Sequence, residues 1–156
     1  MRIASCELAD LSGHEAGRML LEKLYRETVG KELPPILVTE RGKPYFESEP
    51  LHFSISHTKR RAFCVLSDRP VGIDAEEKDR DINPALARKI LSSGELAQFD
   101  AAPDKQLALL TFWVLKEAAA KATGEGLRGY PNHTDFSLND PRVTEIDGCL
   151  VAVIHK

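Results

Sequence analysis

The sequence predicts an α+β fold in which two α+β halves pack together as one unit. The predicted segments follow the order strand, helix and strands, and then strand, helices and strands. The chain has 156 residues, which is the size of one domain, and it shows no repeat, low-complexity tract or linker. We therefore expect one compact body.

The first half of the chain is predicted to contain one helix among several strands. A helix over 12–29 is indicated by apolar residues at helical spacing, and Ser12 with Glu15 matches a capping box. Strands are predicted at 2–8, 36–40, 51–57 and 61–67, and a turn at 41–46. The run 61–67 is continuously apolar, which is typical of a buried central strand.

The second half is predicted to begin with a strand at 71–77 and a charged loop at 76–83. Asn83 and Pro84 are typical of an N-cap and a first helical position, and they predict a helix that reaches Leu91. Ser92 with Glu95 forms a second capping box. Further predicted elements are a helix through Phe99, the longest helix over 105–122 with Gly124 as its C-cap, and strands at 133–138, 142–147 and 148–156.

The composition excludes several classes of protein. The net charge is −3, whereas general nucleic-acid binders have a basic balance. The three cysteines are widely spaced without a CxxC motif, which argues against a disulfide framework or a zinc site. The first residues contain no long apolar run, so we expect no signal peptide, and no stretch approaches the roughly 20 apolar residues of a membrane span. We expect a soluble, cytoplasmic protein that binds neither nucleic acid nor membrane.

Two carboxylates lie close together on the strand at 71–77. Asp74 and Glu76 point to one side of this strand and Ile73 and Ala75 to the other, because side chains alternate. The repulsion between two such carboxylates must be offset by a proton, a basic side chain or a metal ion, and Mg²⁺ prefers carboxylate oxygens. A strand that simply runs into a charged loop is the alternative interpretation.

The longest helix adds a third carboxylate and two cations. One stripe of it carries Trp113, Glu117, Ala120 and Lys121, and Lys116 lies beside that stripe. Together with the strand, these residues could complete a site for Mg²⁺ and a polyphosphate. The segment GEGL (124–127) supplies small residues where a backbone approaches a ligand. The alternative is an exposed Glu117–Lys121 salt bridge with Trp113 in the core.

Two earlier segments carry donors for phosphate oxygens. Arg41 and Lys43 lie on the turn RGKP, and Ser56 and His57 lie at the end of the segment SISH. Ammonium, guanidinium, hydroxyl and ring N–H groups all donate hydrogen bonds to phosphate. A solvated turn and a surface histidine remain the alternative explanation.

Taken together, these segments resemble the 4'-phosphopantetheinyl transferases. The resemblance rests on GKP (42–44), SISH (54–57), GIDAE (72–76), WVLKEAAAK (113–121) and GEGL (124–127), in this order and approximate spacing. Because the GID segment follows about seventy residues of chain, the sequence is similar to the surfactin-synthetase-activating type, and unlike the small acyl-carrier-protein synthase type. The resemblance covers residues 41 to 127.

The resemblance implies an architecture. In that type, two similar α+β halves form a pseudo-dimer within one chain, and the ligand lies between them. Residues 1–70 would form the N-terminal half, with the phosphate-contacting GKP and SISH elements. Residues 71–156 would form the C-terminal half, with the metal-binding elements. One chain that holds both halves implies a monomer.

The resemblance also implies a reaction and roles for residues. 4'-Phosphopantetheine moves from coenzyme A to a serine of an apo carrier protein, and adenosine 3',5'-bisphosphate is released. Asp74, Glu76 and Glu117 would hold Mg²⁺, or Mn²⁺, on the diphosphate. Glu117 would also be the base for the serine, directly or through water, and Lys121 would neutralise diphosphate charge. The implied contacts to coenzyme A are Arg41, Lys43, Ser56, His57, Asp74, Lys116 and Lys121. Trp113 is interpreted as a core residue that fixes the helix.

The implied partner is an apo acyl or peptidyl carrier protein, which is small and acidic. The basic segment TKRR (58–61), or Arg88 with Lys89, is a candidate for docking it. Two other functions stay open. A non-catalytic homologue would bind coenzyme A or a carrier without transfer, and another Mg²⁺-dependent phosphoryl enzyme, such as a nucleotide hydrolase, would release phosphate without a carrier.

Overall fold

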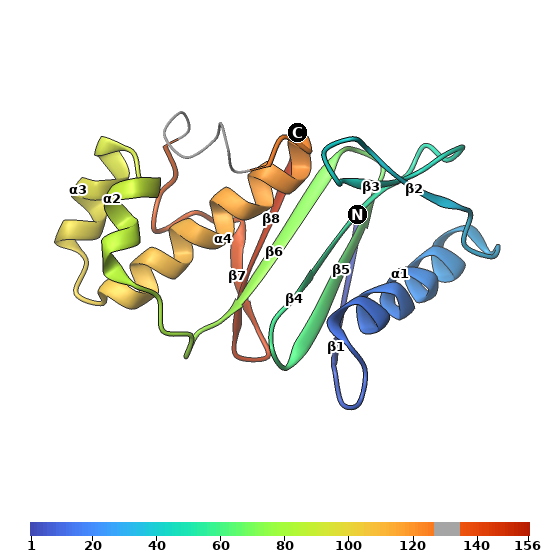
Figure 1. Cartoon of the computed structure of the whole chain (residues 1–156), viewed down its shortest axis with the longest axis horizontal. Coiled ribbons are helices and arrows are strands. Elements are labelled where there is room, and N and C mark those ends of the chain that lie inside the picture. Colours follow the sequence, from blue (N-terminus) through green and yellow to red (C-terminus); the bar gives the residue numbers. More distant parts are fainter. Residues whose placement is uncertain (127–134) are drawn as a thin grey trace.

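The structure, a computed structural model, describes residues 1–126 and 135–156 and contains two three-stranded antiparallel sheets (Figure 1). The first sheet has the order β1-β5-β4, with strands Arg2–Glu7, Arg61–Ser67 and His52–His57. The second has the order β6-β8-β7, with strands Val71–Glu77, Cys149–His155 and Val143–Ile146. The mixed α and β content is as predicted, and β5 is the central strand that its apolar sequence indicated.

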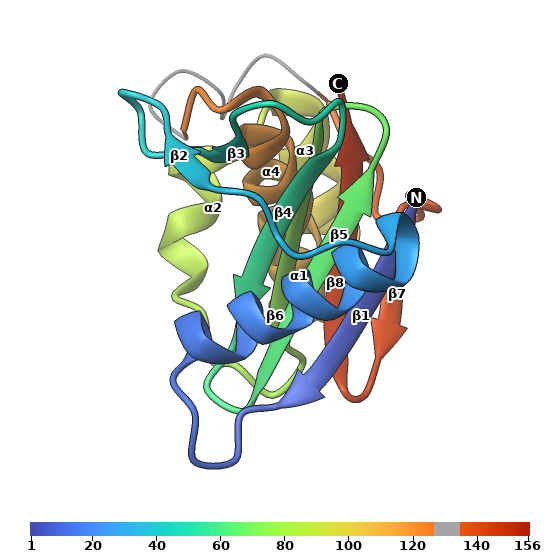
Figure 2. The same ribbon diagram turned by 90° about the vertical axis from the view of Figure 1, so that its right-hand side faces the viewer.

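Helix α1 (Gly13–Val29) covers one face of the first sheet (Figure 2). Its predicted capping box is present, with Glu15 N–H donating to Ser12 Oγ and Ser12 N–H donating to the Glu15 carboxylate. The buried side of α1 packs against alternate residues of β5, and this core includes Leu20, Leu24, Ala62, Cys64 and Leu66. Alternation along β5 therefore leaves its other face free to pack elsewhere.

The segment 41–46, predicted as a turn, is partly a strand. Strands β2 (Ile36–Val38) and β3 (Pro44–Phe46) form a two-stranded ribbon, and only residues 39–43 make the turn between them. Gly42 supplies the positive φ of 86° that this turn requires. Apolar residues on either side of the turn pair with each other, and Ile36 lies opposite Phe46. Phe46 is buried in the core beneath α1.

The second half carries the remaining described helices. They are a 3₁₀ turn (Pro84–Leu86), α2 (Ala87–Ile90), α3 (Ser93–Ala101) and α4 (Lys105–Thr123). The predicted single helix from Pro84 to Leu91 is thus a 3₁₀ turn followed by one α-helical turn, although Asn83 does cap it. The second capping box is present at Ser92, and Gly124 ends α4 with a φ of 75°, as predicted.

The end of the chain differs from prediction in one segment. Strands β7 and β8 lie within the predicted ranges 142–147 and 148–156, but Asp135–Leu138 form no strand, and residues 133 and 134 lie outside the described part. The backbone N–H of Phe136 instead donates to the Glu95 carboxylate. Among the described residues, no helix has the length and hydropathy that crossing a membrane requires. All three cysteines are free.

The two sheets join along strands β4 and β6. The N–H groups of Ile73 and Ala75 on β6 donate to the hydroxyls of Ser54 and Ser56 on β4, at 3.1 and 3.2 Å. Next to this seam, a third apolar cluster brings together side chains of β5, β6 and β8, including Phe63, Val65, Ile73, Ala75 and Val151. The halves therefore share one core, which places β6 at the centre of the molecule.

Candidate functional site

The candidate site lies where α4 runs across β6, and Gly72 makes that close approach possible. A Cβ atom at Gly72 would lie 2.0 Å from the carbonyl oxygen of Ala118 and 2.4 Å from the backbone nitrogen of Ala122. Only glycine lets the strand come so close to the helix backbone. The glycine of the GID segment therefore brings the side chains on this face of β6 within reach of α4.

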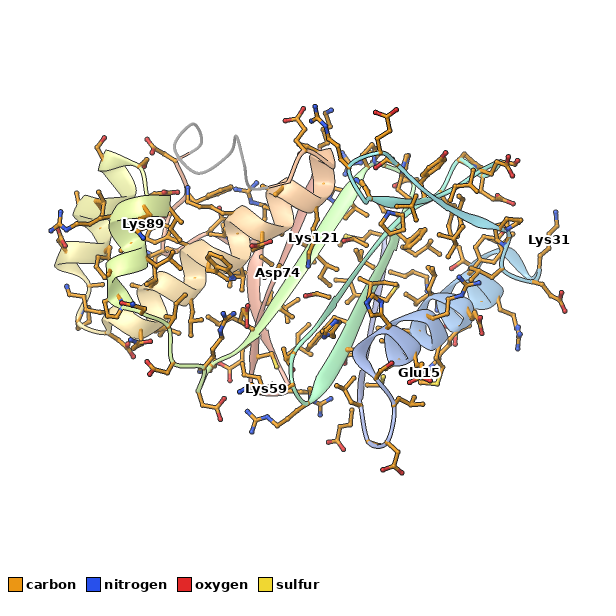
Figure 3. The ribbon with its side chains drawn as sticks, in the orientation of Figure 1. Glu15, Lys31, Lys59, Asp74, Lys89 and Lys121 are labelled. Atoms are coloured by element: carbon orange, nitrogen blue, oxygen red, sulfur yellow. The ribbon has the colours of Figure 1, made fainter. Side chains whose placement is uncertain are left out.

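The predicted alternation along β6 is confirmed. Ile73 and Ala75 lie in the cluster shared by the two halves, whereas Asp74 and Glu76 face α4. Asp74 on β6 and Lys121 on α4 lie near each other in the middle of the molecule (Figure 3). Asp74 is 6% exposed, and its Oδ1 accepts hydrogen bonds from Lys121 Nζ at 2.7 Å and from Ser56 Oγ at 3.2 Å. Its Oδ2 is buried and has no hydrogen-bond partner among the residues that the structure describes. That oxygen is the one polar atom of Asp74 left to bind a ligand.

Glu76 is held by two residues that the sequence interpretation did not assign to it. Trp113 packs against the core of the second half, as expected, and its indole N–H also donates to Glu76 Oε1 at 3.2 Å. The Arg80 guanidinium forms an ion pair with the same oxygen. The only sequence signal for Arg80 was its spacing of four residues from Glu76, which indicates contact on a helix but not along a strand.

The third carboxylate, Glu117, lines a cavity of about 650 Å³ between the two halves. The cavity wall comes from α1, the β2–β3 ribbon, β4 and α4, and it includes Arg41, Lys43, Lys121, Gly124 and Gly126. Two glycines of the GEGL segment thus lie at the cavity, and its Leu127 is outside the described residues. The floor is apolar and includes Ile36, Phe53 and Ile55. A ligand with both charged and apolar parts would fit such a wall.

The three carboxylates share one electrostatic environment. Burial raises the pKa of Asp74, against the opposing charge of Lys121. Burial also raises the pKa of Glu76 and of Glu117, and the negative charge of Asp74 raises both further. Each carboxylate is therefore stabilised by any added positive charge at this place.

The donors suit a hard divalent ion. Within residues 1–126 and 135–156, no three His, Cys, Asp or Glu side chains already converge on one metal position. The group nevertheless consists of carboxylate oxygens alone, and the unpartnered Oδ2 of Asp74 lies among them. Oxygen-only donors favour Mg²⁺ or Mn²⁺ over softer metals.

The four residues of the first half predicted to contact coenzyme A lie in three settings. Arg41 and Lys43 line the cavity, and Lys43 Nζ also donates to the carbonyl of Ala122 at 2.6 Å. Ser56 is buried, and its hydroxyl is committed to Asp74 and to the N–H of Ala75. His57 is exposed and lines a separate cleft of about 1080 Å³ that also contains Glu76 and Arg80.

Lys116, predicted to contact coenzyme A, lies in a different place. Its side chain is 1% exposed, and its Nζ lies 2.8 Å from Oε2 of Glu95, which is 0% exposed. Glu95 also accepts the N–H groups of Ser92 and Phe136 at 2.9 and 3.0 Å. Lys116 therefore points into the core between α3 and α4, because the helix turns it away from the stripe of Glu117.

The basic segment TKRR is largely neutralised by acidic neighbours. Arg60 pairs with Glu77 and Asp79, at 3.1 and 2.8 Å. Arg61 pairs with Asp147 at 3.1 Å and with Glu7 at 3.4 Å. By contrast, Arg88 and Lys89 are exposed on α2, and Figure 3 shows Lys89 at the far end of the molecule from α1.

Comparison with known proteins gives consistent relationships. Residues 70–150 match the family described as the 4'-phosphopantetheinyl transferase superfamily. The chain is 37% identical over 94 residues to a 4'-phosphopantetheinyl transferase of Bacillus subtilis, covering 58% of this chain and 41% of that protein. It is 30% identical over 115 residues to the 4'-phosphopantetheinyl transferase gsp of Aneurinibacillus migulanus, covering 71% and 48%. It is 32% identical over 123 residues to the 4'-phosphopantetheinyl transferase HetI of a Nostoc strain, covering 72% and 52%. The chain thus spans about half the length of these relatives.

Proposed function

Because this chain belongs to the 4'-phosphopantetheinyl transferase superfamily, we propose that it transfers 4'-phosphopantetheine from coenzyme A to a serine of an apo carrier protein. One observation carries the proposal. Glu117 and Lys121 on α4 line a cavity that Arg41 and Lys43 also line, and Asp74 and Glu76 on β6 lie near enough for their charges to raise the pKa of Glu117. Acidic residues next to basic ones suit a diphosphate bound with a divalent ion.

The proposed architecture divides the chain into two halves. Residues 1–70 form one half with the β1-β5-β4 sheet and α1, and residues 71–156 form the other with the β6-β8-β7 sheet and α4. We propose that the two are related as a pseudo-dimer and that coenzyme A lies in the cavity between them. The apolar floor of Ile36, Phe53 and Ile55 supports this, since coenzyme A has apolar as well as phosphate parts.

Asp74, Glu76 and Glu117 are the proposed ligands of Mg²⁺ or Mn²⁺. Mg²⁺ would supply charge neutralisation for the diphosphate and for the departing bisphosphate. Lys121, Arg41 and Lys43 are the proposed contacts to coenzyme A, and His57 at the neighbouring cleft is a further one. Ser56 and Lys116 are assigned structural roles, because their polar groups are buried and paired within the protein.

The chemistry that the chain's own residues perform is proton removal and charge balance. The serine oxygen forms a bond to the β-phosphorus of coenzyme A, and the bond from that phosphorus to the bridging oxygen breaks. Adenosine 3',5'-bisphosphate leaves with the bridging oxygen. Glu117 accepts the serine proton, for which its raised pKa suits it, because a base is most effective near the operating pH. Lys121 offsets negative charge on the diphosphate.

The test is intact-protein mass spectrometry of several apo carrier proteins, each incubated with this chain, coenzyme A and Mg²⁺. We expect a mass gain of one phosphopantetheine that EDTA abolishes. Binding of coenzyme A in calorimetry, with no mass gain on any carrier, would instead support a non-catalytic binding homologue. Phosphate release from nucleotides in the absence of a carrier would support a nucleotide hydrolase.

We further propose that the acidic carrier docks at α2, because Arg60 and Arg61 already pair with acidic residues whereas Arg88 and Lys89 are exposed. The sharpest test compares Lys89→Glu with Lys59→Glu, an equal charge reversal at the exposed lysine of TKRR. Lys89→Glu should raise the KM for the carrier about threefold to tenfold at low salt, and Lys59→Glu less than about twofold. The reverse order would place docking at TKRR.

A further inference from the structure

In the described part of the chain, two cations form ion pairs with carboxylates of the candidate site, and they are held differently. Lys121 Nζ contacts Asp74 Oδ1 at 2.7 Å and the carbonyl of Ile73 at 3.1 Å, and it is anchored on the long helix α4. Arg80 pairs with Glu76 from the loop that follows β6, and its side chain is 43% exposed. Lys121 is therefore fixed by two contacts and a helix, whereas Arg80 reaches its carboxylate from a loop with a partly exposed side chain.

The Arg80 guanidinium also lies against the indole ring of Trp113. It lies 6.0 Å from the centre of the Trp113 ring, and the indole N–H donates to the same Glu76 oxygen. Glu76 thus accepts from both at one oxygen. A second, independent feature points to a cation at this place. The buried Oδ2 of Asp74, two residues earlier on β6, has no hydrogen-bond partner within residues 1–126 and 135–156.

We propose that Arg80 is an internal counter-ion that competes with the divalent ion for Glu76, holding this carboxylate until the ion binds and releasing it afterwards. The proposal rests on the proposed function in one respect, the assignment of the three carboxylates as metal ligands. A guanidinium and a divalent ion in contact with one carboxylate would repel each other, so binding of the ion is coupled to departure of Arg80. The site would then keep its charge balanced in both states.

The structure provides its own reporter for this exchange. Trp113 is the only tryptophan of the chain, and its indole contacts both groups that exchange, Glu76 and Arg80. We would titrate the full chain with Mn²⁺ while recording Trp113 fluorescence, and measure free Mn²⁺ in parallel by electron paramagnetic resonance. Both readouts are independent of catalysis and need no carrier protein.

Arg80→Ala should bind Mn²⁺ about threefold to tenfold more tightly than the wild type, because the competing cation is gone. Arg80→Lys, which keeps the charge, should lie between the two. The matched control is Lys78→Ala. Lys78 lies two residues before Arg80 and pairs with Glu145 at 2.7 Å, away from Glu76. Its replacement removes the same charge and should change the Mn²⁺ affinity less than about twofold.

Three results would overturn the proposal. One is a change in Mn²⁺ affinity for Arg80→Ala that is no larger than the change for Lys78→Ala. Long-range electrostatics alone would then explain the effect of Arg80. Another is weaker Mn²⁺ binding by Arg80→Ala. The last is no binding by either protein up to about 10 mM, beyond the weakest protein sites. A chain that binds Mn²⁺ as expected but modifies no carrier would retain the Arg80 inference and refute the proposed transfer reaction, so the two failures are distinguishable.

Discussion

Helix α4 carries two lysines five residues apart, and their surroundings differ completely. Lys116 and its partner Glu95 have side chains that are 1% and 0% exposed, whereas the side chain of Lys121 is 33% exposed beside the buried Asp74. Both are ion pairs between lysine and carboxylate, yet only Lys121 lies at the cavity. The comparison teaches that the WVLKEAAAK segment combines a residue that holds the helix in place with one that faces the ligand.

The buried pair has a structural explanation. A charge pair removed from water is tolerated only when nearly every polar atom is hydrogen-bonded. Glu95 meets this condition, because it accepts from Lys116 and from the N–H groups of Ser92 and Phe136. It therefore connects α3, α4 and the segment that begins at Asp135. The position of Glu117, one residue after Lys116, depends on this connection.

Glu117→Gln should produce the largest effect on the cavity side. The amide keeps the shape of the side chain but cannot accept the serine proton, so the transfer rate should fall about 10²- to 10⁴-fold. The free energy of unfolding, from urea denaturation, should stay within about 0.5 kcal/mol of the wild type, because Glu117 is half-buried at a cavity wall. A variant that retains the wild-type rate would refute its role as base.

Lys116→Ala should produce the largest effect on the core side. Removing one partner leaves the Glu95 carboxylate buried without its counter-ion, which should lower the free energy of unfolding by about 3–5 kcal/mol. The control is the double variant Glu95→Gln with Lys116→Met, which removes both charges and keeps the volume. It should be clearly more stable than the single variant. Equal stability of the two would show that the buried charge is not what matters.

Lys121→Met should sharpen the contrast between the two lysines. It should lower kcat/KM for coenzyme A about 10- to 100-fold, the effect of one lost charge-assisted contact to the diphosphate. The unfolding free energy should change by less than about 1 kcal/mol, because the Lys121 pair is partly exposed. Steady-state kinetics and urea denaturation on the same preparation measure both quantities. A large stability loss with unchanged kinetics would make Lys121 a second structural lysine.

Much of the fold could be predicted from local signals. Both capping boxes, the Gly124 end of α4 and the central position of β5 follow from residue types at fixed spacing. The ribbon strand β3 was missed because its three residues are too short for a period, and its pairing depends on the turn at Gly42. The predicted strand at 133–138 was wrong in its described part, where the N–H of Phe136 serves a distant carboxylate.

For the site, the sequence could predict which side chains share a face but not which partners they meet. Alternation along β6 correctly separated Asp74 and Glu76 from their neighbours. Helical spacing alone could not tell that Lys116 turns into the core, because its partner Glu95 lies on another helix. Arg80 was missed for the same reason, since its contact depends on the path of a loop. Tertiary contacts of this kind leave no periodic signal.

Lys43 offers the smallest and most discriminating prediction. It contacts the C-terminal end of α4, as a structural lysine does, and it also lines the cavity, as a ligand-facing lysine does. The contact is a hydrogen bond from its Nζ to the carbonyl of Ala122. Lys43→Met should therefore lower the unfolding free energy by about 1 kcal/mol and raise the KM for coenzyme A about threefold. Arg41→Met, at the same cavity wall, is the matched control and should change only the KM. If Lys43→Met changed stability alone, Lys43 would belong with Lys116, as a residue that holds α4 in place without facing the ligand.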